Sequence, residues 1–258
     1  MTVELEVDDQ GIALITMNRP ERLNAMDHEA YQQLSDAWSR VRDDSAIRVA
    51  IITGAGDRAF TTGADLKSFV NAPADLSQFW LTQQGQLLNR GLEVWKPVIA
   101  AVNGYCLGGG MTLLLATDLR IATPTATFAL SEVKRGIIPG NGGTQRILEQ
   151  LPYPVAMDML LTGRTIDAET AERWGLVNRV VPREELLDSA YELAGQIAAN
   201  APLAVQAAKE LALRSRDVDR NTGLRVEMAL NRLLQFSEDA KEGPAAFAEK
   251  RPAQFTGR

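Results

Sequence analysis

Two glycine-bearing segments, about forty residues apart, constrain the fold of this chain more than any other feature. Residues 60–67 read FTTGADLK, and residues 103–111 read NGYCLGGGM. Each segment follows an apolar, partly β-branched run, at 49–53 and at 97–102. A helix-like stretch continues from the second segment to Thr117, and the first segment shows the same pattern more weakly. A strand, a glycine turn and a helix start together present unpaired backbone N–H groups to an anion.

Two such helix starts that converge on one point could hold a developing oxyanion, and this arrangement indicates acyl chemistry. Either segment alone would be interpreted as a tight turn in which glycine adopts special backbone dihedral angles. The repetition of the same context favours a functional role for both segments.

The composition limits the class of protein. The 258 residues can form one large domain, or one domain with an appendage, and can bury a substantial core. Apolar residues make up 45% and charged residues 23% of the chain, as in soluble globular proteins. The formal charge of −6 argues against nucleic acid as a partner, because its binding surface would be a basic stripe. The chain starts without a signal-peptide pattern and has no apolar run of membrane length, so we expect a cytoplasmic protein with no membrane partner.

The scarcity of cysteine and histidine argues against several mechanisms. Cys106 is the only cysteine, so neither an intramolecular disulfide nor a multi-cysteine metal site can form. His28 is the only histidine, and it follows Asp27 at a predicted helix N-terminus, where we expect a surface position. We therefore expect neither a Ser-His-Asp triad nor a metal site.

The apolar patterns predict strands mixed with helices in the first part of the chain. A hairpin is expected over 2–7 and 11–17, and Asp27 is expected to cap a helix that extends to about Arg42. Further strands are predicted at 47–53, 97–103, 118–122, 126–130 and 177–181. Further helices are predicted at 77–94, at 109–117 and, as shorter pieces, within 144–173.

From Glu184 onward every segment has a helical pattern, with expected breaks at 200–202 and at 243–244. Strands mixed with helices, followed by helices alone, predict an α/β core over 1–195 and a helical C-terminal region over 196–258.

Residues 54–59 read GAGDRA and match the dinucleotide-binding pattern G-x-G-x-x-A directly after a strand. That pattern functions when a helix follows at once and a second strand ends in an acidic residue about 20 positions later. Here residues 61–63 interrupt the candidate helix, and Asp75 does not end a strand. We therefore predict no nicotinamide or flavin site.

The order and spacing of many motifs resemble those of the enoyl-CoA hydratase/isomerase (crotonase) family. The motifs are NRP at 18–20, NA at 24–25, FTTGADLK at 60–67, AAVNG at 100–104, GGG at 108–110, FALSE at 128–132, GIIPG at 136–140, GGTQR at 142–146, LTGR at 161–164, AERWGLVN at 171–178 and AFAEKR at 246–251. They cover essentially the whole chain and are specific for the family, although not for one reaction within it. The resemblance implies a spiral of strand-strand-helix repeats with a helical C-terminal region.

The resemblance also implies an acyl-CoA thioester as substrate, so that coenzyme A enters with the substrate and no further cofactor is implied. Members of the family stabilise a thioester enolate with two backbone N–H groups, which by motif position belong to Ala64 and Gly109. Glu132 lies at the position of one of the family's two catalytic glutamates. The N–H of Gly140 would help to position a water or a substrate oxygen.

The neighbours of Glu132 fit such a role. Phe128, Leu130 and Val133 are apolar, and a carboxyl among them should have a raised pKa that suits proton transfer near neutral pH. An isolated glutamate is usually a solvated surface charge, and the motif register is what favours catalysis here.

The chain departs from the family pattern at Thr112. Family hydratases with two catalytic carboxylates carry the other glutamate at this position, after the glycine triplet. A hydroxyl can orient water but cannot act as a general base at neutral pH. Hydration by two carboxylates in its usual form is therefore excluded, and a 1,3-proton shift or water addition by Glu132 alone remains. A small hydroxyl residue here also resembles the family's hydroxycinnamoyl-CoA hydratase-lyases.

Several residues match family positions that contact coenzyme A. Lys67 and Lys250 match basic positions at the nucleotide phosphates, and Asp65 lies in the same segment as Lys67. Arg22 and Leu23 lie on the segment whose backbone meets adenine. In relatives the C-terminal region reaches a neighbouring subunit, which implies a homotrimer or homohexamer and a contact of Lys250 in trans. Trp80 could line the acyl pocket or pack in the core.

The sequence therefore predicts enoyl-CoA hydratase/isomerase-type chemistry on acyl-CoA thioesters, in fatty-acid or related metabolism, with one catalytic glutamate. Two alternatives remain. One is cleavage of a carbon–carbon bond in a hydroxyacyl-CoA, and the other is an acyl-CoA-binding relative with little catalysis.

Overall fold

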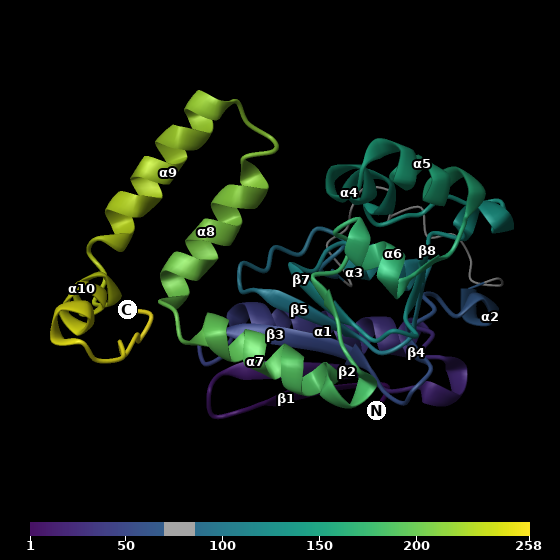
Figure 1. Cartoon of the computed structure of the whole chain (residues 1–258), viewed down its shortest axis with the longest axis horizontal. Helices are drawn as coiled ribbons and strands as arrows, with labels where there is room; N and C mark the ends of the chain where they lie inside the picture. The colour runs from purple at the N-terminus through teal and green to yellow at the C-terminus, as the bar shows by residue number, and fades with distance from the viewer. Residues whose placement is uncertain (70–85) are drawn as a thin grey trace.

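The computed structural model describes residues 1–69 and 86–258, and two sheets form its core (Figure 1). The larger sheet has the order β1–β2–β3–β5–β7–β10, with strands Val3–Val7, Ile12–Met17, Val49–Gly54, Val98–Val102, Leu119–Ala122 and Arg179–Val180. The smaller sheet has the order β4–β6–β8–β9, with strands Ala59–Thr61, Tyr105–Leu107, Thr127–Ala129 and Ile166–Asp167. β1 and β2 form the predicted antiparallel hairpin, and β2, β3, β5, β7 and β10 are parallel neighbours.

The chain builds these sheets as a spiral. The pairs β3 and β4, β5 and β6, and β7 and β8 each give one strand to the larger sheet and one to the smaller sheet. A helical segment follows each pair: α2 at Leu66–Phe69, α3 at Gly109–Leu114, and a 3-10 helix at Glu132–Arg135. This arrangement confirms the predicted spiral of strand-strand-helix repeats. Because β4, β6 and β8 are parallel neighbours, their carboxyl ends lie at one edge of the smaller sheet.

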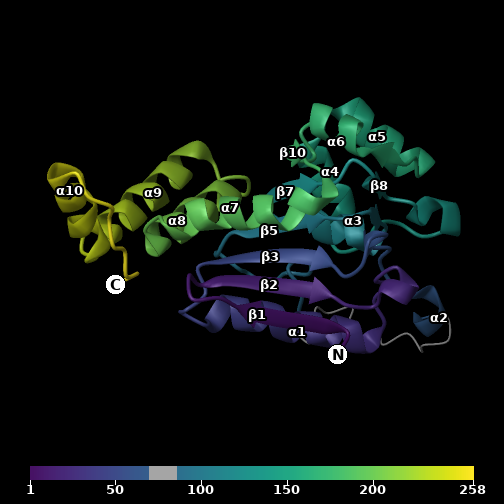
Figure 2. The same cartoon turned by 60° about the horizontal axis from the view of Figure 1, so that its bottom comes forward.

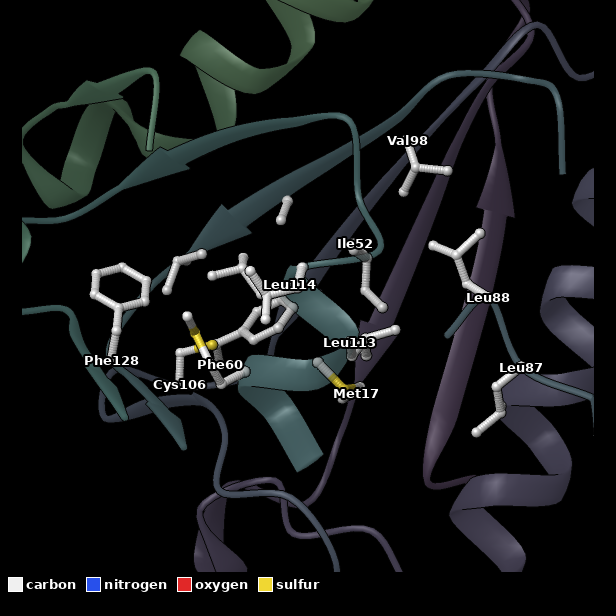
Figure 3. Packing of buried hydrophobic residues seen from close by; sticks show 14 of the residues in the cluster. Met17, Ile52, Phe60, Leu87, Leu88, Val98, Cys106, Leu113, Leu114 and Phe128 are labelled. Carbon is white, nitrogen blue, oxygen red and sulfur yellow. The ribbon is translucent and has the colours of Figure 1, made fainter. Parts of the chain in front are cut away.

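Helices cover both faces of the larger sheet. Every residue of β3 is buried, as expected for a parallel strand with a layer on each side. Ala50 and Ile52 belong to the cluster that contains residues of α1 (His28–Asp43), which Asp27 caps as predicted. Val49 and Ile51 belong to the cluster that contains residues of α7 (Leu186–Ala198). In Figure 3, Phe60, Cys106 and Phe128, one from each parallel strand of the smaller sheet, lie near Leu114 of α3.

The C-terminal helices extend away from the sheets (Figures 1 and 2). They are α8 at Pro202–Arg214, α9 at Arg220–Leu234 and α10 at Asp239–Glu249. Three helices precede α7 along the chain: α4 at Gly143–Gln150, α5 at Tyr153–Thr162 and α6 at Ala168–Arg173. The boundary expected after residue 195 lies inside α7, which packs on the larger sheet. No helix within residues 1–69 and 86–258 is both long and apolar enough to cross a bilayer.

The structure corrects two predicted elements. Within the helix expected over 77–94, residues 77–85 and with them Trp80 lie outside the described residues, and residues 86–94 form no helix, with a turn at 88–91. The break expected at 243–244 is wrong, because α10 continues through Pro244 and the chain breaks at 235–238 instead. Proline removes one helical hydrogen bond, but contacts with the C-terminal residues hold α10: Asp239 accepts from the Gly257 N–H at 2.9 Å.

The strands β4 and β6 were not predicted. We expected the glycine segments to follow the longer strands directly. β4 and β6 are each three residues long, too short to show an alternating pattern. The glycines at 63 and at 108–110 thus follow strands of the smaller sheet, and this brings them next to Glu132.

Candidate active site

The two glycine segments are in direct backbone contact. A Cβ on Gly63 would lie 2.5 Å from the amide nitrogen of Gly109, and a Cβ on Gly109 would lie 3.4 Å from the amide nitrogen of Ala64. Only glycine fits at Gly63, since its φ is +86° as well. The structure therefore brings Ala64 and Gly109 together, as the sequence predicted.

Two backbone hydrogen bonds beside Ala64 orient its N–H. Gly63 C=O accepts from the Met26 N–H at 2.8 Å, and the Asp65 N–H donates to Met26 C=O at 2.8 Å. Because successive residues of an extended chain present their N–H groups to opposite sides, the Ala64 N–H points away from Met26. Gly109 starts α3, where the first N–H groups have no helical acceptor. Within the described part of the chain, neither N–H donates to a protein acceptor.

Thr61 holds the first glycine segment in place. Its Oγ1 donates to Asn24 C=O at 2.6 Å and accepts from the Gly63 N–H at 3.1 Å. A Cβ on Gly110 would lie 2.4 Å from the Thr61 carbonyl oxygen, so α3 also needs glycine to approach β4. Donors held in place before the substrate binds are the requirement for stabilising an oxyanion.

Glu132 follows β8 and lies against the start of α3. Its Oε1 would be 3.5 Å from a Cβ on Gly108. Burial raises the pKa of the Glu132 carboxyl, and the hydrogen bond from its own N–H and the charge of Arg135 oppose this rise. Among the described residues, its Oε2 is buried and has no hydrogen-bond partner. A carboxyl with a raised pKa suits proton transfer near neutral pH.

The apolar surroundings of Glu132 differ in part from the expectation. Phe128 and Leu130 are fully buried, but Val133 is 36% exposed. Gly140 lies in the exposed loop that follows, where a Cβ would meet no atom within 4 Å, and its C=O accepts from the Gly143 N–H at 3.1 Å.

Thr112 is buried in α3, one turn after Gly108. Its hydroxyl donates to Gly109 C=O at 3.0 Å and accepts from Asn89 Nδ2 at 3.1 Å. Its methyl group fills the space beside Gly143, where a Cβ would lie 2.7 Å away. Asn89 was not predicted as a site residue, because it lies in a segment expected to be helical and no motif marks it.

The residues expected at the adenine end of coenzyme A lie beside the first glycine segment. Leu23, with φ of 53°, follows a 3-10 helix at Pro20–Arg22, and its C=O accepts from the Thr62 N–H at 3.2 Å. Arg22 is exposed. Asp65 forms an ion pair with Arg19 at 3.7 Å.

The two lysines expected at the phosphates lie far apart in one chain. Lys67 is exposed in α2, and Lys250 is the exposed C-cap residue of α10. α2 and α10 lie at opposite ends of the molecule in both views (Figures 1 and 2).

The GAGDRA segment does not have the geometry of a dinucleotide site. Gly54 ends β3, and Ala59 starts β4 without an intervening helix. The Gly56 C=O accepts from Asn103 Nδ2 at 2.9 Å and from Arg183 Nη2 at 2.8 Å. In residues 1–69 and 86–258, no three His, Cys, Asp or Glu side chains are grouped as metal ligands would be.

The family model of enoyl-CoA hydratase/isomerase matches residues 8–258 of the chain. The chain is an enzyme of the enoyl-CoA hydratase/isomerase (crotonase) family. It is 44% identical over 257 residues to (E)-benzylidenesuccinyl-CoA hydratase of Thauera aromatica, and 45% identical over 262 residues to carnitinyl-CoA dehydratase of Salmonella arizonae. Both alignments cover 100% of this chain and 100% of the relative.

Solved structures of the family show the same fold. An enoyl-CoA hydratase from Bacillus anthracis has a TM-score of 0.93 at 35% identity, with 100% of both chains covered. An enoyl-CoA hydratase from Mycobacterium tuberculosis has a TM-score of 0.92 at 39% identity, with 100% of this chain and 99% of that chain covered.

Replacement of Ala64 by proline tests the oxyanion site. Proline removes one N–H donor, and since that N–H has no protein acceptor among the described residues, no hydrogen bond of the fold is lost. We expect Ala64→Pro to lower kcat by about 10²- to 10³-fold in steady-state assays. Ala64→Ser, which keeps the N–H, is the matched control and should retain activity. A folded Ala64→Pro enzyme with full turnover would show that this donor has no catalytic role.

Replacement of Glu132 by glutamine tests the raised pKa through stability. An acid whose pKa is raised in the folded state loses stability as the pH rises through that pKa, because the buried carboxylate is then charged. Glu132→Gln should therefore melt at a higher temperature than the wild type at pH 8, and the difference should shrink toward pH 4. Glu227→Gln, at an exposed position of α9, is the control. Equal pH dependence of Tm in wild type and Glu132→Gln would contradict the burial argument.

Proposed function

We propose that this enzyme adds water to 2-enoyl-CoA thioesters and, in reverse, dehydrates 3-hydroxyacyl-CoA thioesters, with Glu132 as its only catalytic carboxylate. The observation that carries the proposal is the half-buried Glu132, with its raised pKa, beside two backbone N–H groups without protein acceptors in the described chain. This combination fits a reaction in which a thioester becomes an enolate while one proton moves.

The steps balance with one carboxylate. The N–H groups of Ala64 and Gly109 would donate hydrogen bonds to the thioester oxygen. Glu132 removes a proton from water while the water oxygen bonds to Cβ, and negative charge moves to the thioester oxygen. Glu132 then gives that proton to Cα, so the product carries OH on Cβ and a new hydrogen on Cα. The carboxylate is regenerated in each cycle.

The relatives favour hydration among the reactions left open by the sequence. The two names reported above, a hydratase and a dehydratase, describe addition and removal of water. Thr112 suggested instead that the site is turned away from hydration. In the structure its hydroxyl joins Asn89 to α3, so a neutral polar pair occupies the position of the second carboxylate.

We also propose that the enzyme assembles as a homotrimer or homohexamer through residues 196–258, with Lys250 contacting the coenzyme A of a neighbouring subunit. Large apolar side chains are exposed on and around α9 and α10, including Met228 at 71%, Phe236 at 77% and Phe247 at 87%. Exposed apolar surface of this extent marks interaction sites. The separation of α10 from α2 supports a contact of Lys250 in trans.

Turnover with product identification tests the reaction. Wild-type enzyme incubated with short, branched and aromatic 2-enoyl-CoAs should form 3-hydroxyacyl-CoA, measured by liquid chromatography and mass spectrometry. Glu132→Gln should lower the rate by about 10² to 10⁴, while thioester binding in calorimetry persists. A 3-enoyl-CoA as the sole product would indicate an isomerase, and an aldehyde with acetyl-CoA would indicate a lyase. Binding without any turnover would identify an acyl-CoA-binding relative.

Light scattering after size-exclusion chromatography tests the assembly. We expect a mass of three or six times 28.1 kDa for the wild type. Met228→Asp should shift the mass toward the monomer, because it places a charge in the apolar surface. Glu227→Gln, at the neighbouring position, should leave the mass unchanged. A monomeric wild type would contradict the assembly.

A further inference from the structure

Asn89 carries a buried oxygen that the described structure leaves without a partner. The residue is 5% exposed, and its Oδ1 has no hydrogen-bond partner among the described residues. The Oε2 of Glu132 is buried and without a partner in the same sense. A buried acceptor left unpaired costs about 1–3 kcal/mol, so its presence points to a group that binds there.

Asn89 and Glu132 both approach the N-terminal end of α3. Glu132 lies against Gly108, and Asn89 Nδ2 donates to the hydroxyl of Thr112 at 3.1 Å. The Thr112 N–H donates to Gly108 C=O at 3.1 Å, so the two residues are one helical turn apart. Gly108 is the N-cap of α3, so both contacts lie at the N-terminal end of this helix. A water that donates to both oxygens requires them to lie within about 6 Å of each other, the span of two hydrogen bonds.

The hydrogen bonds of Thr112 fix which atom of Asn89 is free to bind. A threonine hydroxyl has one proton, and here it goes to Gly109 C=O at 3.0 Å. The hydroxyl oxygen therefore accepts a hydrogen bond from Asn89 Nδ2, and this bond sets the orientation of the carboxamide. Oδ1 is an acceptor only, so its partner must donate a proton, as water and an alcohol do.

We propose that Asn89 binds the water that is added to Cβ of the substrate, an inference that rests on the proposed hydration. The water donates one hydrogen to Asn89 Oδ1 and the other to Glu132, which removes that proton as the oxygen bonds to Cβ. In the reverse direction the 3-hydroxyl group, as it leaves, occupies the same position and becomes water. Asn89 thus supplies the acceptor that a second carboxylate would supply, without a second negative charge next to Glu132.

Two reactions of the same site separate the role of Asn89 from a role in folding. Hydration of a 2-enoyl-CoA requires the bound water, whereas exchange of the α-hydrogen of butyryl-CoA in deuterated water requires only the oxyanion donors and Glu132. Asn89→Leu keeps the size of the side chain and removes its oxygen. We expect its hydration rate to fall by about 10- to 100-fold, as for a lost hydrogen bond of about 1.5–3 kcal/mol to a reacting group, with α-exchange within twofold of the wild type.

Two further variants make the test independent of folding. Asn89→Asp keeps an acceptor oxygen and should hydrate faster than Asn89→Leu, while its charge shifts the acidic limb of the pH–rate profile upward through Glu132. Ser35→Ala removes the 2.7 Å hydrogen bond that ties residue 86 of the same segment to α1. It should lower Tm without changing the ratio of hydration to exchange.

The outcomes are distinct. Equal loss of hydration and exchange in Asn89→Leu, or loss of neither, would overturn the role of Asn89 while the hydratase proposal stands. An Asn89→Asp enzyme with an unshifted pH profile would overturn it as well if Asn89→Leu does not fold. A wild type that exchanges α-hydrogen but adds no water would refute the hydratase proposal itself. A loss of hydration without loss of exchange in Asn89→Leu supports both the role of Asn89 and the hydratase proposal.

Discussion

The contact between the backbones at Gly63 and Gly109 is the constraint on which the site depends. The two backbones approach so closely that no side chain fits between them. This close contact follows from the parallel pairing of β4 with β6. The proposed oxyanion donors are thus positioned by the register of a sheet and by missing Cβ atoms rather than by polar side chains. A site built from the main chain keeps its electrostatic function while the surrounding side chains change, which fits a family whose members carry out more than one reaction.

The sequence predicts those parts of the fold and the site that depend on local patterns. The long buried strands, the cap at Asp27, the glycine segments and the motif that contains Glu132 can all be identified without a structure. The strands β4 and β6 cannot, because three residues give no period and their pairing depends on partners distant in sequence. Asn89 could not be found either, because its role depends on the distant Thr112 and on burial that no local pattern encodes.

A single carboxylate has a physical advantage in this site. Burial already raises the pKa of Glu132, and a second negative charge at residue 112 would raise it further. The pair of Thr112 and Asn89 offers polar atoms without charge, so Glu132 can remain ionised at a lower pH than it could beside another carboxylate. In the proposed mechanism, the neutral pair thus gives up a second proton-transfer group but leaves Glu132 ionised over a wider pH range.

The C-terminal region holds its shape through a charged clasp rather than through a core. Arg251 binds both carboxylate oxygens of Glu242, and the Gln254 N–H donates to the same carboxylate at 2.7 Å. The Arg251 guanidinium and this N–H lower the pKa of Glu242 to about 2, so the carboxylate is charged at neutral pH. It holds Lys250 in the left-handed conformation, which costs a non-glycine residue about 1–2 kcal/mol. The exposed apolar side chains of this region fit the proposed assembly, which would make assembly and substrate binding parts of one event.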